Sequence, residues 1–275
     1  MQSDKSQQND LFFATSTLIC HSTSFEVHLC FQPKYLLSSH MSKLAPLDDL
    51  VQQYKQFDYH NNPALKKRLH EAQQWLKNRI QVTHHELFND AKNQLMAQYF
   101  LNRLYGGPEF DALAKQIERL VKIAHKAEKM VPENTILTGI QSVGLAVLAM
   151  RLDEQVAKQL LADYPADQAI DDEMMRLTLI KLDQREARLK QLDLLDGLGV
   201  SLDKYLRSFI VHTAFKMCKG PAHKYKFDLM YDFIGEGFAA MKPLKSATQF
   251  IGSFTAKERI IVENVHSGKV DPFRV

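Results

Sequence analysis

Apolar residues recur every three or four positions along most of the chain from residue 41 onward. In the segment after Asn62-Pro63, Leu65, Leu69, Leu76 and Ile80 follow this spacing and fall on one face of a helix. Asn62 supplies a cap, and proline is favoured in the first turn. Similar stripes predict helices over about 47–54, 64–80, 83–104, 110–124, 134–164, 167–196, 201–219, 224–241 and 246–265.

Short polar or glycine-proline segments separate these stripes. Thr83 and Glu86 fit a capping box, in which each side chain satisfies a free amide at the helix start. Gly197 and Gly199 predict an end to the long helix, and Ser201 then caps the next one, which is expected to end at Gly220-Pro221. The pattern shows no convincing strand and no repeat of fixed period. It predicts an all-α fold, a single multi-helix bundle of about nine or ten helices without significant sheet, over residues 41–275.

The segment 134–150 contains no formal charge. Its length is near the lower limit for crossing a bilayer, but Thr135, Thr138, Gln141 and Ser142 interrupt the apolar run. We therefore interpret it as a central helix buried on most sides by its neighbours, and we expect no membrane as a partner of the protein.

Residues 1–40 differ from the rest in having few charges and no sustained period. The character changes at Met41, which we interpret as the true start, with 1–40 a disordered or non-native extension. As a secretory signal, the apolar run from Leu11 to Cys20 lacks a positively charged leader. A zinc site in this segment is disfavoured, because its spacing matches no common structural site; its candidate ligands are Cys20, His21, His28 and Cys30.

Composition narrows the class of protein. Hydrophobic residues make up 45% and charged residues 24% of the 275 residues, which are ordinary globular values. The net charge of +3 is too small to indicate a nucleic-acid or membrane surface by itself, and three cysteines exclude a disulfide framework. These values favour a cytoplasmic protein.

One short motif carries a family resemblance. The run Tyr99–Gly106, YFLNRLYG, followed by GPEF, resembles the signature of the bacterial FFLEELY-motif proteins, an uncharacterised helical family. The resemblance extends over about residues 47–268 and includes Gly237-Phe238 and Glu258-Arg259. Its motif positions are Tyr99, Phe100, Leu101, Leu104, Tyr105 and Gly106.

The chain departs from this signature at its acidic pair. Asn102 and Arg103 stand where the family name spells two glutamates, while the apolar positions are retained. A motif that keeps its apolar residues and replaces its acids predicts packing. The resemblance implies a helical fold and supplies no activity.

Few residues are candidates for chemistry. Adjacent His84 and His85 point about a quarter-turn apart, so they do not share the helix face that a metal site needs. His212 lies among apolar residues and is the best candidate for an axial haem ligand, although a core histidine is more common there. Cys218 is interpreted as an ordinary buried or half-buried thiol. We predict no catalytic residues, no metal and no cofactor.

The one notable basic segment is 216–226, with Lys216, Lys219, Lys224 and Lys226. These lysines could contact an anionic partner, including phosphates. Cations at a helix C-terminus are a simpler explanation, so nucleic-acid binding is the less favoured interpretation.

The sequence favours a binding protein without catalysis, whose partner is a ligand, another protein or a second copy of the chain. One alternative is a ligand or haem carrier, or an enzyme, with an aromatic-lined pocket near His212. A second alternative is a nucleic-acid-associated protein that uses the segment 216–226.

Overall fold

The computed structural model describes residues 42–104, 110–126, 128, 133–206 and 208–275. The expectations for residues 1–40, the start at Met41, and the motif residues Tyr105 and Gly106 lie outside these ranges. The regular elements within them are all helical, which confirms the predicted all-α bundle. They are α2 (Ala45–Lys55), the 3-10 helix η1 (Asp58–His60), α3 (Pro63–Thr83), α4 (His85–Asn89), α5 (Gln94–Tyr99), the π-helix η2 (Phe100–Leu104), α6 (Phe110–Lys126), α7 (Glu133–Asp163), α8 (Asp172–Leu182), α9 (Arg185–Leu206), α10 (Phe209–Met217), α11 (Lys219–Lys224), α12 (Asp228–Met241) and α13 (Ala247–His266).

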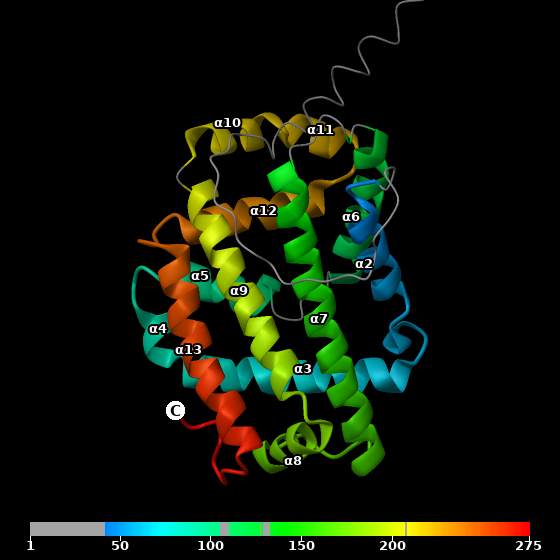
Figure 1. Cartoon of the computed structure of the whole chain (residues 1–275), viewed down its shortest axis with the longest axis vertical. Helices are drawn as coiled ribbons and strands as arrows, with labels where there is room; N and C mark the ends of the chain where they lie inside the picture. The colour runs from blue at the N-terminus through cyan, green and yellow to red at the C-terminus, as the bar shows by residue number, and fades with distance from the viewer. Residues whose placement is uncertain (1–41, 105–109, 127, 129–132, 207) are drawn as a thin grey trace, which may run out of the picture.

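Three long helices, α7, α9 and α13, run along the length of the molecule (Figure 1). α9 contacts α13 on one side and α7 on the other. α3 crosses them towards one end, where α8 also lies, and α10 and α11 lie end to end across the opposite end (Figure 1). The bundle therefore has two different ends, and α10 and α11 form one of them.

Apolar clusters hold the helices together. Phe100, Phe250 and Phe254 belong to one cluster, which joins η2 to α13. Leu160 and Val265 belong to another, which joins α7 to α13. Burial of such side chains is the main favourable term in folding, at about 25 cal/mol per Å² of apolar surface.

The C-terminal tail folds back onto α3. Gly268 adopts a positive φ of 76°, which glycine tolerates without steric cost, and turns the chain at the end of α13. Phe273 is buried, and its ring packs edge-on to Trp75 at 5.0 Å between centroids. Nδ2 of Asn264 donates a hydrogen bond to the carbonyl oxygen of Pro272 at 3.3 Å. The tail is therefore part of the core.

The prediction that Gly197 and Gly199 end a helix is wrong, because α9 runs through both and through Ser201. A Cβ at position 199 would lie 3.0 Å from Cδ1 of Ile251 and 3.4 Å from Cα of Thr248. The missing side chain of Gly199 therefore lets α13 approach closely. Gly199 therefore allows close packing of α9 against α13, at a moderate cost in the helix propensity of α9.

The predicted helix 167–196 is also divided. α8 begins at Asp172, whose neighbour Asp171 accepts a hydrogen bond from the amide of Met174 at 2.8 Å. Asp183 then adopts a left-handed conformation with φ of 47° and ends α8. This conformation is uncommon outside glycine, although Asn and Asp adopt it more readily than other residues.

Two further boundary predictions are wrong. Thr83 is the last residue of α3 and its hydroxyl makes no capping bond; α4 begins after His84, which provides no side-chain cap. The predicted helix 83–104 is split into α4, α5 and η2. The dipeptide 220–221 lies inside α11, where proline is tolerated because first-turn amides have no intrahelical acceptor.

α7 contains the apolar segment 134–150. By length and composition α7 is the one helix of the described ranges that could cross a membrane, but it contacts α2, α3, α8 and α9. Ile136, Val147 and Met150 are buried, whereas most of the apolar half is only half-buried and Leu137 is 49% exposed. The helix lies within the bundle with less complete burial than the sequence predicts.

Candidate functional site

α10 is anchored to the bundle by one of its faces. The hydroxyl of Ser208 accepts a hydrogen bond from the amide of Val211 at 3.3 Å and caps the helix. Val211 is buried, and the ring of Phe215 stacks on Tyr231 of α12 at 4.3 Å. Phe215 also meets Phe238 edge-on at 5.2 Å. These contacts fix which side of α10 faces solvent.

The opposite side of α10 is apolar and exposed. Phe209 is 82% exposed, Ile210 53% and Met217 55%. At about 100° per residue, these three side chains and the exposed Thr213 fall within one sector of about 100°. Single exposed apolar residues are ordinary on protein surfaces, but several on one helix face mark a contact surface.

The lysines singled out in the sequence are all exposed and lie at the same end of the molecule. Lys216 is on α10, Lys219 and Lys224 are on α11, and Lys226 follows α11. Lys226 has a positive φ of 57°. We call the exposed residues of these two helices the α10–α11 surface: Phe209, Ile210, Thr213, Lys216, Met217, Lys219, His223 and Lys224.

α6 supports the chain where α11 ends. Nη2 of Arg119 donates a hydrogen bond to the carbonyl oxygen of Tyr225 at 2.7 Å, and its guanidinium lies 4.7 Å from the ring centroid of Phe227. Phe227 is buried. This connection holds α11 between α10 and α12.

His212, the candidate axial ligand, lies on α10, is half-buried and faces α12. Its ring centroid lies 5.0 Å from that of Phe238. Cys218 is buried, and burial raises the pKa of its thiol, so the nearby lysines do not activate it. The pocket expected near His212 is occupied by aromatic packing, because the ring of Phe215 packs against both Tyr231 and Phe238.

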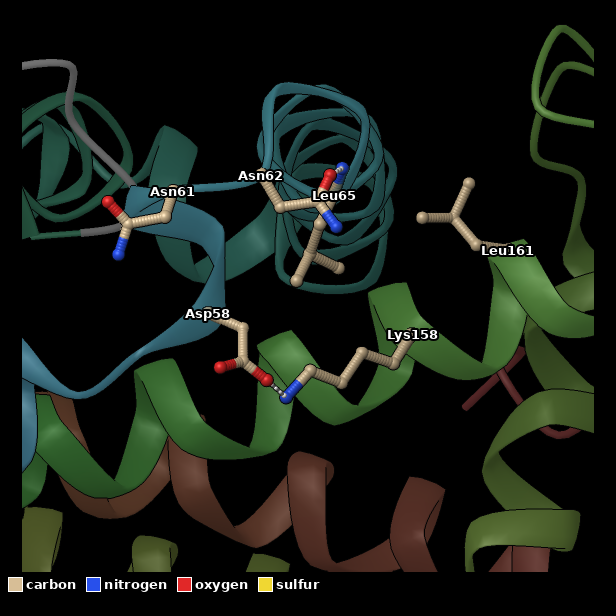
Figure 2. Close-up of a pocket in the computed structure, with 6 residues that line it drawn as sticks. All are labelled: Asp58, Asn61, Asn62, Leu65, Lys158 and Leu161. Atoms are coloured by element: carbon tan, nitrogen blue, oxygen red, sulfur yellow. Dashed lines mark hydrogen bonds and ion pairs between the residues drawn. The ribbon is translucent and has the colours of Figure 1, made fainter.

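A cavity of about 410 Å³ lies elsewhere, beside η1, α3 and α7 (Figure 2). Nζ of Lys158 lies 2.7 Å from Oδ2 of Asp58 and 3.0 Å from Oε2 of Glu154, and these carboxylates raise the pKa of Lys158 against the effect of burial. Figure 2 shows the carboxylate of Asp58 and the ammonium group of Lys158 pointing toward each other across the space between η1 and α7. No spacing in the sequence predicts this cavity, because the residues that line it come from three elements; they are Asp58, Asn61, Asn62, Leu65, Lys158 and Leu161.

A polar network lies next to η1. The hydroxyl of Tyr54 donates to Oδ1 of Asp111 at 2.6 Å, and Nζ of Lys66 lies 3.0 Å from Oδ2. Partial burial would raise the pKa of Asp111, but these hydrogen bonds lower it. Burial, followed by the hydrogen bond to Asp111, raises the pKa of Tyr54. The network joins α2, α3 and α6, and its charges balance internally.

A second polar cluster is buried where α3 meets α13. Nε2 of His84 lies 2.7 Å from Oε1 of Glu258, and Nη2 of Arg79 lies 2.8 Å from Oε2. Burial would raise the pKa of Glu258, but Arg79 and His84 lower it to about 2. The ring of His84 is therefore held inside the core by its contact with Glu258, and the rings of Phe88 and Phe254 flank it.

The described part of the family motif packs partly into the core. Phe100 is buried against Phe254, with ring centroids 4.8 Å apart. The hydroxyl of Tyr99 donates to the carbonyl oxygen of Phe233 at 3.0 Å. A Cβ at Gly237 would lie 3.0 Å from this hydroxyl, so the absent side chain there makes room for the tyrosine. Leu101 is half-buried and Leu104 is 38% exposed.

Arg103 replaces one of the signature's two acids. Its Nε lies 2.7 Å from Oε2 of Glu236 on α12, while Asn102 is exposed. The pair crosses from η2 to α12 beside Tyr99. In the described residues, these motif positions hold two helices together.

No three or more His, Cys, Asp or Glu side chains of the described residues are grouped so that they could hold a metal ion.

A sequence family covers the helices described above. The model of a domain of unknown function, DUF8198, matches residues 56–272. The chain belongs to this family. The DUF8198 match runs from the end of α2 to the C-terminal tail, so it includes the α10–α11 surface, the cavity beside η1 and the Glu258 cluster. No curated protein and no solved structure matched the chain.

Proposed function

We propose that the protein is a binding protein without chemistry of its own, which docks on a negatively charged partner through the α10–α11 surface. The observation that carries the proposal is the combination of exposed lysines with exposed apolar side chains on two adjoining helices. Exposed apolar area gives affinity, and surface lysines favour an anionic partner and speed the encounter.

The other polar groups support this choice over a catalytic site. Asp111 and Glu258 each have cationic partners at hydrogen-bonding distance, and their pKa values are lowered, which makes them poor proton acceptors at neutral pH. The cavity beside η1 is lined by an ion pair, Asp58 with Lys158. The pairing of Asp58 with Lys158 supports a structural role for these two residues.

A more specific family relationship than the DUF8198 match is also proposed. We propose that DUF8198 includes the FFLEELY-motif proteins, because Tyr99, Phe100 and Leu101 retain the apolar positions of that signature. A bacterial source and a cytoplasmic location are part of the same proposal.

Two alternatives receive weaker support. A haem carrier would use His212, but Phe238 packs against its ring. A nucleic-acid-binding protein would use the same lysines, and it is one form that an anionic partner can take.

Retention on immobilised heparin, a polyanion without base or lipid character, tests the proposal. The K216E/K219E variant should elute at much lower salt than the wild-type protein, since surface charge interactions are screened by salt. The matched control is K92E/K269E, which changes the net charge equally at exposed positions away from α10 and α11. Equal elution of the two variants would contradict a docking surface at this end of the molecule.

A further inference from the structure

The charge of the α10–α11 region is one-sided. No acidic residue occurs between Asp203 and Asp228, whereas this stretch contains Lys204, Arg207, Lys216, Lys219, Lys224 and Lys226. A run of one sign is a footprint for a partner of the opposite sign.

The flanking acids are engaged in other contacts. Asp203 accepts hydrogen bonds from the amide of Ala247 at 2.6 Å and the hydroxyl of Ser246 at 2.5 Å. Oδ1 of Asp228 lies 2.8 Å from Nδ1 of His223. Each acid is thus held by a neighbour, Asp203 at the start of α13.

The apolar residues lie among these lysines. At about 100° per residue, Lys216 is next to Phe209 around α10, and Met217 and Ile210 lie further round the same sector. An amphipathic helix at a bilayer surface places apolar side chains about 5–10 Å into the boundary between headgroups and acyl chains, with lysines at the anionic headgroups.

The shape of this end also suits a flat partner. α10 and α11 lie end to end across the end of the molecule, and the long helices α7 and α9 run away from them (Figure 1). Both short helices can therefore touch one plane at the same time.

The side chains distinguish between anionic partners. Nucleic acids bind to lysines through their phosphates and to aromatic rings through their bases. The side chains of Ile210 and Met217, which are apolar and not aromatic, contribute little to such binding. A membrane with acidic lipids offers both anionic headgroups and an apolar layer beneath them. Of the two, the lipid surface matches both components.

We infer that the anionic partner is a bilayer containing acidic phospholipids, which the protein binds peripherally through the α10–α11 surface, with Phe209, Ile210 and Met217 entering the interface. This inference rests on the proposed function and names its partner.

Co-sedimentation of the full chain with vesicles tests the inference. We expect binding to vesicles of phosphatidylglycerol and phosphatidylcholine in equal amounts, and little binding to phosphatidylcholine alone. Replacing lysines should weaken binding about fivefold for each charge removed. F209S/M217S should weaken vesicle binding about tenfold or more and leave binding to duplex DNA or heparin unchanged.

The outcomes separate the two proposals. Lysine-dependent binding to heparin or DNA without vesicle binding would overturn the lipid inference and keep the proposed function. Absence of binding to heparin, DNA and acidic vesicles would overturn both. Equal binding of F209S/M217S and wild type to acidic vesicles would overturn the inserted apolar face. A wild-type dimer that F209S/M217S converts to a monomer would assign the face to a second copy and also overturn the inference.

Discussion

The seam between α9 and α13 differs from the α10–α11 surface in how its charged residues are arranged. At the seam, cations and acids pair across the two helices, whereas the surface carries cations. Along the seam, Nη2 of Arg259 lies 2.6 Å from Asp193 and 2.8 Å from Asp196, and Arg185 pairs with Glu263 at 2.6 Å. These cations have acids on the facing helix. The stretch that includes α10 and α11 has cations without any acid of its own.

The difference separates residues that serve the fold from residues available to a partner. Paired charges beside a packed seam contribute to the choice of register between two helices, and the seam buries apolar side chains such as Ile251, which faces Gly199 of α9. On α10 the large apolar side chains Phe209 and Met217 face solvent instead. Removing residues from the two regions should therefore affect different properties.

The largest expected effect is in the buried Glu258 cluster, on the face of α13 that meets α3. Glu258→Ala removes the carboxylate that Arg79 and His84 share and leaves the buried guanidinium of Arg79 without its anion, and breaking such a buried pair costs about 3–5 kcal/mol. Urea denaturation should show this loss in the free energy of unfolding. The control Glu263→Ala removes a half-exposed pair on the same helix and should cost about 1 kcal/mol or less. Similar losses of unfolding free energy in both variants would contradict the distinction between the buried pair and the half-exposed pair.

The same cluster predicts a pH dependence. The pKa of Glu258 in the folded protein is about 2, below its unfolded value of about 4.3. The stabilisation from Glu258 is therefore complete above the unfolded pKa and disappears as the pH falls towards 2. Unfolding free energies measured across this range should fall less steeply in Glu258→Gln than in the wild-type protein. Parallel curves would show that Arg79 and His84 do not hold the carboxylate in its charged form.

Packing along the seam is tested by a pair of glycines. Gly199→Ala places a methyl group against Ile251, while nothing lies within 4 Å of a Cβ at Gly197. Both substitutions gain the same helix propensity, so the difference isolates the contact. We expect Gly199→Ala to be less stable than Gly197→Ala by about 1–3 kcal/mol in chemical denaturation. Equal stabilities would mean that α13 can move away without cost.

The cap at the start of α13 should have a smaller effect. Asp203 accepts hydrogen bonds from the amides of Ala247 and Thr248, and these and the hydroxyl of Ser246 lower its pKa to about 2 against the effect of burial. Asp203→Ala should lower the free energy of unfolding by about 1–2 kcal/mol. Asp193→Ala is the control, because Asp193 is 70% exposed and Arg259 keeps its contact with Asp196.

The smallest effect on stability is expected at the α10–α11 surface. F209S/M217S and K216E/K219E should each change the free energy of unfolding by about 0.5 kcal/mol or less, since exposed side chains contribute little. Differential scanning calorimetry provides the measurement. A loss comparable to that of Glu258→Ala would show that these residues pack against part of the protein.

The periodicity of the sequence was sufficient to predict the class of fold but not the faces of every helix. In α3 one face is apolar and the other is polar, so the spacing alone predicts its core residues Leu65, Leu69 and Ile80. In FIVHTAF of α10, by contrast, the apolar residues surround the helix, and no period can indicate which of them face solvent. The exposure of Phe209 depends on the tertiary packing of α12.

The polar sites were less predictable, because they join residues distant in sequence. His84 and Glu258 are separated by 174 positions, and no spacing relates them. Gly199 was interpreted as a helix end, since a single sequence does not show that α13 passes close to it. The lysines of α10 and α11 were identified because they cluster within one short segment.

The packing of the C-terminal tail has a practical consequence. Trp75 is the only tryptophan of the chain, and its ring touches Phe273 at the end of the polypeptide. Because an indole's emission depends on its immediate surroundings, intrinsic fluorescence excited at the tryptophan band is a natural reporter of whether the tail is docked on α3. A shift in that emission that precedes the loss of helical circular dichroism would reveal release of the tail as a separate early step of unfolding.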